Sequence, residues 1–170
     1  MINFAVNWIT QIQSNSPANS YFIMSEGLSE PYKIILPDIP SAGVYFFTTD
    51  SGMQYEVRFG RKKDDILSSI IVFGVINEEF EGEEYVMTNK NEVYRVMSTM
   101  VNIILIFRKE HPNVRSYEFT GEPKQGESLD SSTQRIRLYS RYVQRMFDKE
   151  EWELIPGKNT IAVQRKNRFS

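Results

Sequence analysis

The sequence predicts an α+β fold: a mostly antiparallel sheet with two long helices. Residues 93–105 repeat apolar side chains with a helical period, and residues 131–147 do so again. Short runs of alternating polarity lie before, between and after these two segments. The predicted order is therefore strands, helix, strand, helix and a closing hairpin. A length of 170 residues suits one domain over residues 1–170.

The chain before the first helix is predicted to form most of the sheet. Residues 1–20 make an N-terminal segment, with a short helix after Asn3 and a polar, turn-rich stretch at 13–20. Further on, Asp50-Ser51-Gly52 lies between two alternating runs and is typical of a hairpin turn. Residues 69–76 are densely apolar, as in a central strand. The predicted strands of this part are residues 21–24, 32–36, 44–49, 54–59, 69–76 and 83–88.

Two helices and three strands are predicted for the rest. The first helix ends near His111-Pro112, and residues 116–120 form a strand. The second begins at the capping box Ser131–Gln134, and residues 152–155 and 160–164 form the last hairpin. The apolar faces are Val93, Val96, Met97, Met100, Val101, Ile104 and Leu105 in the first helix, and Ile136, Tyr139, Val143 and Met146 in the second.

Composition excludes several kinds of chemistry. The chain has no cysteine, so disulfides, thiolate nucleophiles and cysteine-based metal sites are excluded. Its one histidine, His111, cannot build a multi-histidine metal site and is expected to be a solvated residue at the helix end. We therefore expect no metal. No apolar stretch is long enough to cross a bilayer, and residues 1–12 show no signal-peptide pattern, so we expect a cytoplasmic protein without membrane contact.

Charge is distributed unevenly along the chain. Residues 64–92 carry eight acids against Lys90, a local net charge of −7, whereas residues 135–170 carry nine bases against four acids, a net charge of +5. This asymmetry suits contact with a partner, and it equally suits two sides of one domain that attract each other.

The order of elements over residues 44–166 resembles the GNAT acyltransferase fold. In that resemblance residues 83–88 are the strand that enters the cofactor site, residues 93–108 the cofactor-facing helix and residues 116–120 the splayed strand. The run Arg137-Leu138-Tyr139-Ser140-Arg141 resembles the helix segment of that family that bears a Leu-Tyr pair. The spacing of the two helices is also similar to that of small uncharacterised phage-encoded proteins.

The resemblance implies an acyl-CoA site at the start of the first long helix, and the residues there depart from it. Pyrophosphate binding needs close backbone approach, which family members achieve with a glycine-rich loop. In this chain the corresponding loop has no glycine and consists of Asn89, Lys90 and Asn91. The next residue, Glu92, adds a negative charge. These three residues would bind the cofactor only if the chain were an acyltransferase using acetyl-CoA. We expect no cofactor.

Catalytic candidates follow from the same resemblance. Tyr139 would match the tyrosine that protonates the leaving thiolate, and Glu83 or Glu84 would be a general base. The alternative for Tyr139 is a core residue on the apolar helix face, and for the two glutamates a solvated acidic segment. We prefer the alternatives, and therefore no catalytic residue.

Arginines line one side of the second predicted helix. Arg137, Arg141 and Arg145 recur every four residues, and Arg135 lies near the helix start. Guanidinium groups bind carboxylates and phosphates, so this row could hold an acidic protein surface or a nucleic acid. A pI of about 5.6 and the absence of a nucleic-acid motif disfavour nucleic acid. An exposed face paired with acids of the same chain is the simpler alternative.

Three classes of function remain open. The first is a non-catalytic interaction or structural protein on a GNAT-like scaffold, phage-encoded, acting as a virion component or a host-directed factor, with a protein partner or self-association. The second is a divergent acyltransferase, and the third a nucleic-acid or nucleotide binder through the arginine row. The loop without glycines favours the first.

Overall fold

The computed structural model describes residues 28–76, 90–120 and 134–167, and in residues 90, 91, 134 and 135 the backbone only. The predicted strands at 21–24 and 83–88, the N-terminal helix and the capping box at Ser131 lie outside these residues. The described elements are a short 3-10 turn η1 (Pro40–Ala42), β1 (Val44–Thr48), β2 (Gln54–Lys62), β3 (Asp65–Val75), α1 (Lys90–Glu110), β4 (Ser116–Thr120), α2 (Gln134–Met146), β5 (Trp152–Pro156) and β6 (Thr160–Arg165).

The described strands form one mixed sheet in the order β1-β2-β3-β4-β6-β5. Every neighbouring pair is antiparallel except β3 and β4, which run parallel from Ser68 opposite Ser116 to Ile71 opposite Phe119. Since α1 joins these two strands, the parallel pair requires a crossover, and α1 provides it. The predicted α+β class and the mostly antiparallel sheet are confirmed.

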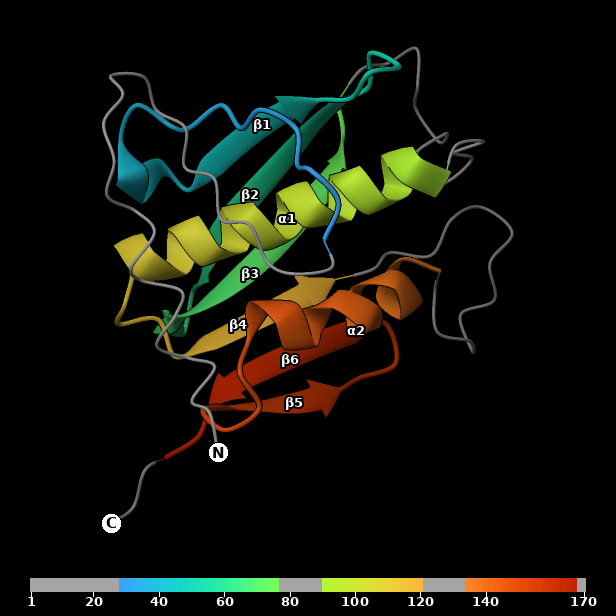
Figure 1. Ribbon diagram of the computed structural model, residues 1–170. Coiled ribbons are helices and arrows are strands. Elements are labelled where there is room, and N and C mark those ends of the chain that lie inside the picture. The colour runs from blue at the N-terminus through green and yellow to red at the C-terminus, as the bar shows by residue number, and fades with distance from the viewer. Residues whose placement is uncertain (1–27, 77–89, 121–133, 168–170) are drawn as a thin grey trace, which may run out of the picture.

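Both helices lie on the same side of the sheet (Figure 1). The chain therefore has two layers, with α1 over the strands β1 to β3 and α2 over β4, β6 and β5 (Figure 1). Alternate side chains of each strand point towards the helices, as a pleated strand requires. Those buried residues include Tyr45, Phe47, Tyr55, Val57, Phe59, Ile71, Phe73, Tyr117, Phe119, Ile161 and Val163.

Aromatic rings connect the two halves of this core. Phe73 of β3 stacks on Tyr55 of β2, with ring centroids 5.0 Å apart, and also contacts Tyr139 of α2 at 6.1 Å. Tyr139 in turn lies 5.7 Å from Phe119 of β4. Because Tyr139 contacts both strands of the parallel pair, it joins α2 to the region covered by α1.

The predicted hairpins and helix faces are confirmed, and one strand prediction is wrong. The turn between β1 and β2 places Gly52 at φ 90°, a left-handed conformation that favours glycine. Residues 32–36, predicted as a strand, form no strand. Ile35 makes a single bridge to Phe46, and Tyr32 is instead held against α1. The predicted order of elements is thus matched in part.

Both edges of the described sheet are partly closed to further pairing. On β1, Ile35 exchanges two backbone hydrogen bonds with Phe46, at 2.8 and 3.1 Å. Next to β5, Gly157 donates its N–H to Thr160 of β6, and Glu151 accepts from Lys166 just after β6, so the even-numbered residues between them face outward. Of these, Trp152 donates its N–H to Asp148 and Pro156 has no N–H, which leaves only Leu154 as an outward backbone donor.

None of the helices in the described ranges is both long enough and apolar enough to cross a membrane.

Candidate functional site

The start of α1 is the place where the GNAT resemblance implies an acyl-CoA site. Glu84 and Asn89 lie outside the described residues, as do the side chains of Lys90 and Asn91. Glu92 is described: it is only 9% exposed, and its carboxylate accepts a hydrogen bond of 3.0 Å from the backbone N–H of Ser51. The carboxylate in the first turn of α1 therefore binds the turn between β1 and β2.

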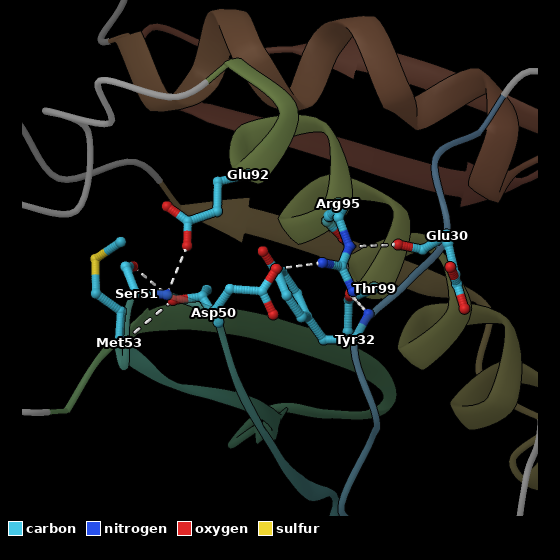
Figure 2. A network of polar contacts seen from close by, with 9 residues as sticks. Glu30, Tyr32, Asp50, Ser51, Met53, Glu92, Arg95 and Thr99 are labelled. Carbon is cyan, nitrogen blue, oxygen red and sulfur yellow. Dashed lines mark hydrogen bonds and ion pairs between the residues drawn. The ribbon is translucent and has the colours of Figure 1, made fainter.

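Figure 2 shows that Glu92 belongs to a larger set of polar contacts. One turn further along α1, Arg95 forms an ion pair with Asp50 of the same β1–β2 turn, with Nη1 and Oδ2 2.5 Å apart. Its Nε donates to the carbonyl of Glu30 at 3.0 Å, and its guanidinium lies 4.0 Å from the centre of the Tyr32 ring. Arg95 thus holds two segments that are distant in sequence against the same helix.

Thr99 completes this contact set on the next turn of α1. Its hydroxyl accepts the N–H of Tyr32 at 2.8 Å and donates to the carbonyl of Arg95 at 2.7 Å (Figure 2). We call Glu92, Arg95 and Thr99 the α1 clamp. Every member contacts another part of the fold, so the clamp is a structural assembly.

Tyr139, the conditional catalytic residue, is 2% exposed. Its ring lies between Phe73 and Phe119. A leaving thiolate must reach the hydroxyl that protonates it, and a side chain enclosed in the core does not offer that access. The structure places Tyr139 as a residue that joins α2 to the sheet.

The arginine row lies on the solvent side of α2. Arg137, Arg141 and Arg145 are exposed, while Ile136, Val143 and the rest of the predicted apolar face are buried. With 100° per residue, Arg141 stands almost opposite the centre of the buried face. The side chain of Arg135 lies outside the described part of the chain.

This row has no counterpart of opposite charge on its own helix. Residues 134–147 contain no acid. In the described ranges, Arg137 and Arg141 form no ion pair. Like charges at i and i+4 destabilise a helix by about 0.2–0.5 kcal/mol per pair, and arginine in the first turn opposes the helix dipole. The row therefore costs stability.

Tyrosines lie beside the row, where α2 faces α1. Tyr142 is half-buried, and its pKa is raised by burial and then by the neighbouring Tyr94 of α1, while Arg145 and Arg141 lower it. Tyr94 is 48% exposed. The surface formed by Arg137, Arg141, Arg145, Tyr142 and Tyr94 is called the α2 face below. Tyrosine and arginine are the residue types that most often dominate binding energy in protein interfaces.

Two other cations of the basic segment, Arg165 and Lys166, have structural contacts. Arg165 lies 5.2 Å from the centre of the Trp152 ring, and Lys166 donates to the carbonyl of Lys149 at 2.7 Å. With Arg115 and Asn167 they line an open cleft of about 470 Å³, whose other residues are Glu150 and Glu151. Since acids and bases alternate there, this cleft has little net charge. The basic segment of the sequence thus divides into a mixed cleft and a purely cationic helix face.

His111 lies at the end of α1 as predicted, but it is half-buried rather than solvated. Its ring stacks on Phe107, with centroids 4.0 Å apart, and its Nδ1 lies 3.0 Å from the Phe107 carbonyl oxygen. Across the described ranges, no three Asp, Glu or His side chains are grouped so that they could hold a metal ion.

Comparison of the chain with protein-family models, with curated proteins and with solved structures found no match. The sequence predicts the α2 face more directly than the α1 clamp. The clamp joins residues up to 67 positions apart and has no periodic signal. The α2 face is visible in the sequence as three arginines at helical spacing, although its tyrosine from α1 is not.

Proposed function

We propose that this chain is a non-catalytic interaction or structural protein on a GNAT-like scaffold. The observation that carries the proposal is the bond between the Glu92 carboxylate and the Ser51 amide at the start of α1. An acyl-CoA pyrophosphate would need this first turn to be open and electropositive. Here a buried carboxylate brings negative charge to it and is committed to the fold.

The core position of Tyr139 supports the same proposal. Its enclosure between Phe73 and Phe119 gives the tyrosine a packing role that explains its presence without catalysis. The likeness in helix spacing to small phage-encoded proteins makes a virion component or a host-directed factor the setting that we propose. A protein partner or self-association, in the cytoplasm of the host or in the virion, belongs to this function.

Calorimetric titration with acetyl-CoA and with CoA tests the proposal. We expect no heat of binding at millimolar cofactor for the natural chain, because the first turn of α1 presents Glu92. The variant Glu92→Gln serves as a matched control, since it removes the charge while keeping an acceptor for Ser51. Saturable binding near micromolar to the natural chain would overturn the proposal in favour of a divergent acyltransferase. Sedimentation over a range of concentrations, run in parallel, would detect self-association.

A further inference from the structure

One side of the sheet carries no helix in the described part of the chain. Both helices lie on the other side (Figure 1), and the strand register places every second side chain away from them. We call the side without a helix the open face. Its apolar and charged residues include Ile35, Val44, Phe46, Glu56, Arg58, Lys62, Ile70, Val72, Glu118, Glu153, Ile155 and Ala162.

The open face has the apolar pattern of a covered surface. A solvated sheet face is normally polar, and parallel strands are normally covered on both faces. β3 belongs to the parallel pair, and its residues 70–73 are all apolar, as in a strand that is covered on both sides. Yet Val72, in the third of six strands, is 52% exposed, and Ile35 and Ile155 towards the two edges are exposed as well. Exposed apolar residues gathered on one face indicate an interaction surface.

The connections of the chain favour a separate molecule as the cover of this face. Leu28, the first described residue, packs against the core, and the carbonyl of Glu30 accepts a hydrogen bond from Arg95 of α1. Residues 77–89 lead into α1, and residues 121–133 lead into α2. Each of these long undescribed stretches therefore joins the helix layer, which lies on the opposite side of the sheet from the open face.

The charges of the open face favour a second copy of this chain. On β2 and β4 they are Glu56, Arg58, Lys62 and Glu118, which form two ion pairs. Arg58 Nη2 lies 2.8 Å from Glu56 Oε1, and Lys62 Nζ lies 2.6 Å from Glu118 Oε2. The centre of the face thus has both signs and no net charge. In a two-fold dimer a surface meets itself, so a surface of one sign would repel its copy, whereas this one can place bases opposite acids.

We infer that two copies of this chain pack with their open faces together, as the two sheets of a β-sandwich do. This inference rests on the proposed function, which includes self-association, and adds the surface and its symmetry. The size of the face is adequate: six strands span about 24 Å, and their lengths run from about 17 to about 36 Å, an outline of roughly 600 Å². The accessible area of a side-chain surface exceeds its outline, so the face approaches the area of about 800 Å² per partner that a stable interface buries.

Sedimentation equilibrium of the full chain from micromolar to millimolar concentration tests the inference. We expect a reversible equilibrium between monomer and dimer. Val72→Lys should weaken the dimer by at least about tenfold, because the interface would then bury an ammonium group from each copy. Val72→Thr keeps the branched shape and adds only a hydroxyl, so it should weaken the dimer less than Val72→Lys does.

Leu154→Lys is the matched control. Leu154 is another exposed apolar residue of the same sheet, at 43% exposure, but its place opposite Val163 puts it on the helix side. The dissociation constant of this variant should remain within about twofold of that of the natural chain, since its new charge lies outside the open face. The thermal midpoint of each variant, measured alongside, separates lost association from lost folding.

Four results would overturn the inference. These are a monomer at every concentration, a mass that keeps rising beyond that of the dimer, a dimer that both Val72 variants leave unchanged, and equal weakening by Leu154→Lys and Val72→Lys. Binding of acetyl-CoA by the same preparation would instead contradict the proposed function and leave the dimer standing, so the two failures are distinguishable.

Discussion

The two helices lie on the same face of the sheet, yet they use polar residues in opposite ways. In α1, Glu92, Arg95 and Thr99 bind the β1–β2 turn and the segment around Tyr32. In α2, Arg137 and Arg141 face solvent and form no ion pair in the described ranges. The difference shows that the charged residues of two neighbouring helices can have different roles in the fold. Those of α1 make contacts with other parts of the fold, whereas Arg137 and Arg141 of α2 are exposed to solvent.

Burial differs between the helices as well. Residues 96–104 of α1 are all buried, including Ser98, Thr99 and Asn102, so this helix is enclosed on nearly every side. In α2, a buried residue is followed within one turn by exposed arginine. We therefore expect substitutions in α1 to affect stability more than substitutions on the exposed side of α2.

The largest expected effect comes from a charge in the centre of α1. Met97→Asp or Ile104→Asp would place a carboxylate at a position with 0% exposure, at a cost above about 4 kcal/mol. Since domains of this kind are stable by only about 5–15 kcal/mol, we expect loss of soluble, cooperatively folded protein. Met97→Leu, which nearly conserves volume, is the control and should melt normally. A soluble Met97→Asp protein with a cooperative melt would contradict the assignment of the buried face.

An intermediate effect is expected when the arginines of the two helices are compared directly. Arg95→Ala removes an ion pair, a hydrogen bond to Glu30 and the contact with the Tyr32 ring, and should lower the free energy of unfolding by about 2 kcal/mol. Arg137→Ala should change it very little. Urea melts of both variants provide the measurement, and equal losses would remove the distinction between the helices.

High pH should affect the two halves of the core to different degrees. Burial raises the pKa of Tyr117 to about 12, while the charges of Arg108 and Arg165 act to lower it. Burial raises the pKa of Tyr45 above its usual range too, and there the carboxylate of Glu110 raises it further by charge and by accepting the hydroxyl at 3.1 Å. Tyr45 should therefore remain protonated to a higher pH than Tyr117.

Both shifts favour the folded state while the tyrosines are neutral. An unfolded tyrosine loses its proton near pH 10, so above that pH the unfolded chain binds fewer protons and the free energy of unfolding falls until the folded pKa is passed. Urea melts near pH 8 and near pH 11 measure this loss. We expect Tyr117→Phe and Tyr45→Phe each to lose less stability between these conditions than the natural chain. An unchanged pH dependence in both would contradict the cited shifts.

The smallest effect on stability is expected for Arg141→Glu. The substitution replaces two repulsive i,i+4 pairs by two attractive ones, so the thermal midpoint should stay the same or rise by about 1–3 °C. Differential scanning calorimetry provides the measurement. A fall of several degrees would show that Arg141 supports the fold and would bring α2 into line with α1.

Local patterns in the sequence were sufficient for most of the fold. The helical repeat from Val93 to Leu105 and the turn at Asp50-Ser51-Gly52 depend on neighbouring residues, and the structure confirms both. The segment around Tyr32 could not be predicted in this way. Its alternating side chains suggested a strand, but its backbone N–H binds Thr99, 67 residues away, and such a contact leaves no periodic trace.

The sequence also predicted part of the candidate site, namely the arginine row, but not the contacts of Glu92. The spacing of Arg137, Arg141 and Arg145 placed them on one side of a helix, and the structure shows all three exposed on α2. For Glu92, the sequence predicts only that a negative charge lies at the start of the helix. Its bond to Ser51 depends on how β1 and β2 turn beneath α1, which no short-range pattern specifies.

The partly covered edges of the sheet bear on how such a protein behaves when many copies are crowded together. An open edge strand attracts other edge strands without regard to sequence, and at high concentration it leads to aggregation. Ile35 covers the middle of β1, and Trp152 and Pro156 leave β5 with one outward donor. These contacts leave fewer backbone groups for strand pairing between crowded copies, so contact between them depends more on surfaces whose side chains select the partner.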